Sequence, residues 1–323
     1  MAITMAQALN TALHDAMAED DRVVMFGEDV GKLGGVFRIT DKLQERFGDK
    51  RCFDTPLAES GIVGSAIGMA LYGYKPVVEM QFDGFTYPAF EQIVSHLAKM
   101  RNRSRGTVQL PVVVRIPYGG GIGAVEHHSE SPEAFFAHTA GLKVVAPGTP
   151  SDAYSLLRES VTTPDPVIFF EPKRRYWLKE DAELPVSTEP MGTAVIRRPG
   201  TTATLFAYGP MVRTAVDTAK AAEEEGWDLE VVDLRTLNPF DARTVVSSVE
   251  KTGRAVVIHE AQVFAGFGAE VAAQVAEHAF YHLEAPVLRV GGFDIPYPAA
   301  KLEEFFLPDV DRILDAVERS LNF

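Results

Sequence analysis

Short apolar runs alternate with amphipathic stretches along most of the chain. Runs such as "RVVMFGED", "KPVVEMQF", "LPVVVRIPY" and "DPVIFFEP" have the length and the branched side chains of buried strands. Between them, apolar residues recur at helical spacing, and "YPAFEQIVSHLAKMRNRS" is one such predicted helix. The alternation of strands and helices predicts an α/β fold with a mostly parallel sheet.

The pattern breaks once, in a polar segment punctuated by prolines at about 173–200, which predicts a linker. A second alternating block follows, with predicted strands such as "TATLFAYG", "RAVVIHEA" and "PVLRVGG". The chain has 323 residues, which is too many for one compact core. We therefore predict two domains, 1–189 and 190–323.

Composition and charge narrow the functional class. Apolar residues make up 46% of the chain and aromatic residues 10%, so both domains can bury a core. The net charge of −14 argues against a nucleic-acid partner, because phosphates would be repelled. Cys52 is the only cysteine, which excludes a disulfide scaffold and agrees with a reducing cytosol. No run approaches the roughly 20 apolar residues of a membrane span, and the N-terminal segment reads as an amphipathic helix rather than a signal peptide. We expect a cytoplasmic protein without a membrane partner.

Glu59 opens a predicted helix that is almost entirely small and apolar. The plain interpretation is an acid that the helix dipole stabilises in the first turn. Gly61, Gly64 and Gly68 lie on one face of this helix, although each glycine costs about 1 kcal/mol relative to alanine. Two explanations remain open: a tightly packed internal helix pair, or a subunit interface beside a ligand that Glu59 faces.

Two histidines follow a glycine-rich loop at the end of another predicted strand. The strand "LPVVVRIPY" runs into "GGGIG", and His127 and His128 precede a helix that starts near Ser131–Glu133. Such loops bind ligands in open α/β sheets, while the plain alternative is an exposed histidine pair. The lack of a cysteine or a His-x-x-x-His pair beside them argues against zinc, and "GGGIG" does not match the dinucleotide fingerprint.

Two further strand ends carry polar residues. "EMQFDGF" places Gln81, Phe82 and Phe85 after a strand, and the alternative is a group of core aromatics with a solvated Asp83. "IHEAQVFAGFGAE" places His259 and Glu260 before a glycine-containing turn, which we interpret as a plain strand–loop–helix connection.

Longer strings identify a family. "FGEDVGKLGGVFRIT", "FDTPLAESGIVG", "HHSESPEAFFAHTAGLKVVAPGTP" and "VVDLRTLNPFD" occur in this order, among others. Together they resemble the beta subunit of the decarboxylating component of thiamine-diphosphate-dependent 2-oxo acid dehydrogenases, from about residue 3 to Phe323. "HSESPEAFFAH" is most similar to the branched-chain (2-oxoisovalerate) enzymes.

The resemblance implies two three-layer α/β/α domains: a transketolase-like pyrimidine-binding domain and a transketolase C-terminal domain. It implies oxidative decarboxylation of branched 2-oxo acids and reductive acylation of the lipoyl group of a partner acyltransferase. A pyruvate or acetoin dehydrogenase beta subunit, a non-catalytic scaffold and a self-sufficient homodimeric thiamine enzyme are the alternatives. The partner implied is an alpha subunit, in a heterotetramer of two alpha and two beta chains. Because no Gly-Asp-Gly motif occurs here, the alpha chain is expected to supply the diphosphate and Mg²⁺ side of the cofactor site.

The resemblance also assigns roles. Glu59 matches the glutamate that bonds the aminopyrimidine ring of the cofactor, and His128 matches a catalytic histidine that stabilises oxyanions. His127 receives no catalytic role, and Glu28 extends an acidic hydrogen-bond path behind Glu59. The predicted cofactor-binding residues are Leu57, Glu59, Gln81, Phe85 and Glu28.

Two further sites follow from the same resemblance. A potassium ion is implied through backbone oxygens, with Val112, Ser160, Thr163 and Asp165 in the matching region. The second domain is implied to dock the acyltransferase, in a region that contains "LEAPVLR" and Phe323.

Overall fold

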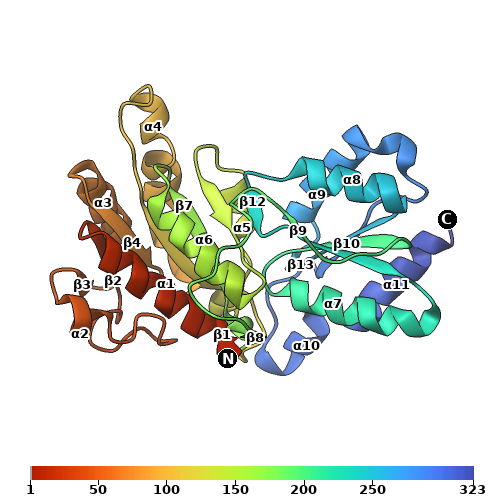
Figure 1. The fold of residues 1–323 in the computed structure, drawn as a ribbon, viewed down its shortest axis with the longest axis horizontal. Coiled ribbons are helices and arrows are strands. Elements are labelled where there is room, and N and C mark those ends of the chain that lie inside the picture. Colours follow the sequence, from red (N-terminus) through yellow and green to blue (C-terminus); the bar gives the residue numbers. More distant parts are fainter. Residues whose placement is uncertain (1) are drawn as a thin grey trace.

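The computed structural model describes residues 2–323, which form two sheets with helices packed on both faces of each (Figure 1). The first sheet has seven strands, and β12 is its one antiparallel member. In spatial order its strands are β3 (Cys52–Asp54), β2 (Val23–Gly27), β4 (Lys75–Glu79), β5 (Val113–Tyr118), β7 (Val167–Pro172), β6 (Lys143–Val145) and β12 (Thr236–Asn238).

The second sheet has five strands, and only its edge strand β9 is antiparallel. In spatial order its strands are β14 (Leu288–Gly292), β13 (Ala255–Gln262), β10 (Ala203–Ala207), β11 (Leu229–Asp233) and β9 (Val195–Arg198). A separate pair joins β1 (Ala2–Thr4) to β8 (Lys179–Asp181).

Helices cover both sheets (Figure 1). The longer helices are α1 (Met5–Glu19), α3 (Glu59–Leu71), α6 (Pro150–Thr162), α7 (Met211–Ala221), α8 (Ala242–Thr252), α9 (Phe267–His278) and α11 (Val310–Leu321). The shorter ones are α2 (Leu43–Phe47), α4 (Met100–Arg103), α5 (Glu133–Ala137) and α10 (Glu303–Phe306).

Alternate residues of one strand show why each domain has three layers. In β2, Val23 and Met25 pack into the core formed with α1 and α6, whereas Val24 and Phe26 pack into the core formed with α3. Because successive side chains of a strand point to opposite faces, a strand that is apolar throughout must be covered on both sides. The predicted α/β architecture with two three-layer domains is confirmed.

The two domains share one core. β12, from the second half of the chain, pairs with β6 of the first sheet, so this strand crosses the expected division. At the same junction Arg235, which is fully buried, donates to Asp152 at 2.9 Å. The expected boundary near residue 190 falls between β8 and β9, and it stays a prediction.

One segment that we predicted as a regular helix is not regular in the structure. The region of "YPAFEQIVSHLAKMRNRS" contains a 3₁₀ segment (Asp83–Ala89), a π-helical segment (Gln92–Leu97) and then α4. Pro88 is tolerated in the first turn of a helix, so it does not by itself explain the π-helical segment that follows. No helix within residues 2–323 has both the length and the apolarity needed to cross a membrane.

A buried hydrogen bond at the domain junction generates a pH prediction. The Tyr208 hydroxyl donates to Oε1 of Glu133 at 2.6 Å, and burial raises the pKa of Glu133 to about 7. The folded state therefore holds a proton that the unfolded state loses near pH 4.5, so the glutamate contributes less to stability as pH rises toward 7.

We expect Glu133→Gln to raise the melting temperature at pH 8 and to leave it almost unchanged at pH 5. The full shift corresponds to at most about 3 kcal/mol, or a few degrees. Calorimetry of both proteins across this range would measure it, and a gain that is larger at pH 5 than at pH 8 would contradict the assignment.

Candidate active site

The first sheet gathers the candidate residues at one edge. Glu28 follows β2, Glu59 opens the helix after β3, Gln81 follows β4, and the histidine-bearing loop follows β5. These four strands are neighbours and run parallel. Their carboxyl ends therefore meet at the same edge, which is where open α/β sheets bind ligands.

Glu59 and Glu28 form a buried acidic pair. Glu59 is the first residue of α3 and is only 7% exposed, and no hydrogen bond or ion pair joins its side chain to another residue of 2–323. Both carboxylate oxygens of Glu28 are buried without a hydrogen-bond partner in the same part of the chain. Burial, and then the nearby charge of Glu59, raises the pKa of Glu28. Buried polar atoms usually have partners, so these carboxylates fit a ligand that brings its own hydrogen-bonding nitrogens.

His128 lies in an aromatic cage. Its ring stacks on Phe82 with centroids 4.0 Å apart and meets the edge of Phe85 at 5.2 Å. Its Nδ1 lies 3.0 Å from the carbonyl oxygen of His127. His128 is half-buried and His127 is exposed, which agrees with a role for His128 alone.

A buried ion pair that the sequence analysis missed holds this histidine in place. Asp83, which the alternative interpretation placed in solvent, is fully buried and pairs with Lys173, which also donates to the His128 carbonyl oxygen. The second oxygen of Asp83 accepts from the amide of Glu130 at 2.9 Å. Burial raises the pKa of Asp83 to about 6 and lowers that of Lys173. Lys173 directly follows β7, and Asp83 lies a few residues after the end of β4; these positions near strand ends were the signal in the sequence.

The remaining cofactor-binding candidates lie around this site. Gln81 donates to Asp29 at 3.0 Å, and Phe85 faces His128. Leu57 is 76% exposed and packs into no core cluster of residues 2–323. If it lines a cofactor pocket, a second chain must close that pocket.

The glycine face of α3 is open. A Cβ at Gly68 would meet nothing within 4 Å, one at Gly61 would touch only Ala58, and one at Gly64 would lie 3.7 Å from the Gln92 side chain, an ordinary contact. The alternative of a tightly packed internal helix pair is therefore wrong for residues 2–323, and the subunit-interface explanation remains. A cavity of about 440 Å³ lies beside this face, between the helix and the ends of β2 and β3.

In the region predicted to bind potassium, lysine and arginine side chains already contact two of the side-chain oxygens. Lys143 donates to Thr163 at 3.0 Å, and Arg101 pairs with Asp165. The Ser160 hydroxyl donates within its own helix, to Leu156, and the Val112 carbonyl accepts from the Val167 amide. Across the described residues no group of three or more His, Cys, Asp or Glu side chains is arranged to hold a metal. A potassium ion would depend on backbone oxygens, and this site stays a prediction.

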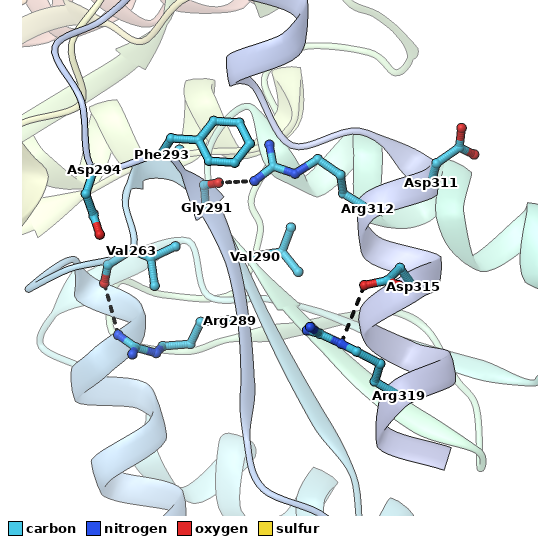
Figure 2. Close-up of a pocket in the computed structure, with 11 residues that line it drawn as sticks. Val263, Arg289, Val290, Gly291, Phe293, Asp294, Asp311, Arg312, Asp315 and Arg319 are labelled. Carbon is cyan, nitrogen blue, oxygen red and sulfur yellow. Dashed lines mark hydrogen bonds and ion pairs between the residues drawn. The ribbon is translucent and has the colours of Figure 1, made fainter. Parts of the chain in front are cut away.

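Another cavity, of about 530 Å³, lies between β14 and α11 of the second domain, and none of the candidate site residues lines it. Figure 2 shows Arg312 reaching from α11 to the Gly291 carbonyl, and Arg319 paired with Asp315 on the same helix. Arg289 donates to the Val263 carbonyl at 3.0 Å. Arg319 has a carboxylate partner, whereas Arg289 and Arg312 donate to neutral carbonyl oxygens, which do not compensate their charge.

Comparisons with known proteins agree with this geometry. Residues 1–177 match the family described as transketolase, pyrimidine binding domain, and residues 192–313 match transketolase, C-terminal domain. The chain is 57% identical over 321 residues to the 3-methyl-2-oxobutanoate dehydrogenase subunit beta of Mycobacterium tuberculosis, covering 99% of this chain and 92% of that protein. The chain belongs to the family of 2-oxo acid dehydrogenase beta subunits.

Other relatives bear the names of different substrates. Identity is also 57% to the pyruvate dehydrogenase E1 component subunit beta of Leifsonia xyli, over 99% of this chain and 95% of that protein. It is 46% to the 2-oxoisovalerate dehydrogenase subunit beta of Pseudomonas aeruginosa, again over 99% and 95%. A solved structure titled "Split gene transketolase, inactive beta4 tetramer" superposes with a TM-score of 0.82 at 25% identity, over 99% of this chain and 98% of that one. As a beta subunit, this chain belongs to a thiamine-diphosphate-dependent, lipoyl-linked class of oxidoreductases that also requires an alpha subunit.

The Asp83–Lys173 pair generates a stability prediction. Lys173→Met leaves the Asp83 carboxylate buried without its counterion, and breaking a buried pair from one side costs about 3–5 kcal/mol. We expect the free energy of unfolding in urea to fall by that order, and Asp83→Asn in the same chain to restore part of it. Lys179→Met, at an exposed lysine nearby, is the control. A loss for Lys173→Met no larger than that of the control would show that the pair is not stabilising.

Proposed function

We propose that this chain is the catalytic beta subunit of a branched-chain 2-oxo acid dehydrogenase, acting on substrates such as 3-methyl-2-oxobutanoate. The observation that carries the catalytic part is Glu59, a buried carboxylate without a protein partner at the start of a helix whose glycine face is open. The branched-chain assignment is supported by "HSESPEAFFAH" and by the name of the Mycobacterium tuberculosis relative. A pyruvate enzyme is the second candidate, because a relative with that name is equally similar.

The residues fit the pyrimidine side of thiamine diphosphate. Glu59 would accept and return a proton at the ring nitrogen of the cofactor, with Glu28 as a neighbouring proton acceptor. Burial and the nearby Glu59 charge raise the pKa of Glu28, which favours the protonated form of that carboxyl. Phe85 and Leu57 offer apolar surface for the ring, and Gln81 a polar contact. When bound, the cofactor supplies the electron sink that decarboxylation needs.

His128 would hold or donate a proton at the substrate oxygen. Phe82 fixes the plane of its ring, and no hydrogen bond within residues 2–323 occupies its Nε2 atom. That nitrogen is therefore available to a substrate or to the lipoyl group of the acyltransferase.

The assembly we propose has two alpha and two beta chains. The open glycine face of α3 and the exposed Leu57 support burial against another chain. The alpha chain would supply the diphosphate and Mg²⁺ side of each site, and a potassium ion would bind near Val112. The second domain would dock the acyltransferase near the exposed Tyr281 and Phe323, and the complex would work in the cytoplasm.

The role of Glu59 is tested in the assembled alpha–beta complex. We expect Glu59→Gln to lower the rate of 2-oxo acid decarboxylation at least 100-fold, because general acid–base contributions are about 10²–10⁴. Size-exclusion chromatography should show unchanged assembly, and Glu45→Gln on α2, an exposed glutamate, should keep the wild-type rate. Near-normal turnover of Glu59→Gln would favour a scaffold subunit instead.

The substrate is tested by comparing kcat/KM of the same complex for 3-methyl-2-oxobutanoate and pyruvate. We expect at least a tenfold preference for the branched acid. A preference for pyruvate would assign the chain to the second candidate.

A further inference from the structure

The loop 119–130 joins β5 to α5 and carries His128. The Gly119 amide donates to the Glu130 carbonyl at 2.9 Å, which closes the loop at its base. We call this segment the histidine loop. Its last part is held by Asp83 and Lys173 from the first domain, as described above, whereas its first part is held by the second domain.

Two glutamates of the second domain accept hydrogen bonds from backbone amides of this loop. Glu303, which opens α10, accepts from Gly121 at 3.0 Å with Oε2 and from Gly123 at 2.9 Å with Oε1. Glu260, in β13, accepts from Gly120 at 3.1 Å. Backbone amides that converge on a carboxylate form a concave anion-binding arrangement, and such charge-assisted bonds are stronger than neutral ones.

Both carboxylates are themselves held in place. The Tyr297 hydroxyl donates to Oε2 of Glu303 at 2.9 Å, and Nε of Arg174 lies 2.9 Å from Oε1 of Glu260. Glu303, Glu260 and Tyr297 are all less than 9% exposed. A Cβ at Gly120 would lie only 1.7 Å from the Tyr297 hydroxyl oxygen, so the close approach of the two domains requires glycine there.

These contacts explain the "GGGIG" run, to which the proposed reaction gives no role. Its amides resemble a phosphate cradle, but the protein's own glutamates already occupy them. The second domain therefore fixes the position of the first part of the histidine loop.

We infer that Glu303 and Glu260 are positioning residues for His128, so that the second domain holds the catalytic histidine against the substrate. The inference rests on the proposed function and adds to it the groups that place His128. It follows from the steep dependence of catalysis on geometry, because a displacement of about 1 Å can lower a rate 100-fold.

The test uses Glu303→Gln in the complete alpha–beta complex. The glutamine side chain has one acceptor oxygen, so either Gly123 loses its partner or Gly121 keeps only the Tyr297 hydroxyl, 3.3 Å from its amide. We expect kcat for the 2-oxo acid to fall about 10- to 100-fold while KM changes less than about twofold. Glu304→Gln, at the next residue of the same helix, is exposed and is the matched control, with unchanged kinetics expected.

Two measurements separate positioning from a general loss of structure. Amide hydrogen exchange of the histidine loop should accelerate in Glu303→Gln, while exchange in β10 and β13 stays at the wild-type rate. The double variant His128→Ala/Glu303→Gln should be no slower than His128→Ala alone, because residues that act as a unit are not additive.

The inference is overturned if Glu303→Gln matches Glu304→Gln in kcat, if exchange of the loop is unchanged, or if the double variant loses the two effects additively. Inactivity of the unsubstituted complex toward every 2-oxo acid would instead overturn the proposed function. The exchange comparison would then still decide whether Glu303 holds the loop.

Discussion

The buried ion pair between Asp83 and Lys173 is the interaction on which the arrangement of the site depends. It bridges the ends of β4 and β7 and contacts the backbone at both His128 and Glu130. Burying two charges is favourable only when their remaining hydrogen-bonding capacity is used. Here the loop backbone uses that capacity, so the loop position and the stability of the pair are coupled.

The second domain completes this arrangement from the opposite side. Its glutamates accept amide hydrogen bonds from the same loop, and its strand β12 extends the first sheet. The apolar core is also continuous, because Phe206 and Val232 of the second sheet belong to the same cluster as Ile116 and Phe170 of the first. Both domains therefore hold the loop that carries His128, and the polar contacts between them fix the position of this loop.

The pyrimidine side of the site is organised differently, because it is left open. Glu59 and Glu28 are buried without hydrogen-bond partners among residues 2–323, while Leu57 and the glycine face of α3 are uncovered. The unpaired Glu28 carboxylate beside an uncovered helix supports our proposal of a cofactor site shared between two chains. In the function that we propose, contacts within this chain hold His128, whereas a partner chain would close the site around the acidic pair.

The sequence by itself determined the α/β architecture, because apolar runs that alternate with amphipathic helices can be buried in few other ways. It also indicated Glu59 and His128, since both belong to long family strings at strand ends. Only the tertiary structure decided that Asp83 is buried, that the "YPAF" region is not a regular helix, and that the amides of "GGGIG" contact Glu303 and Glu260. Those outcomes depend on pairs such as Gly121 and Glu303, far apart in the chain, and local periodicity carries no information about which distant group a polar atom will meet.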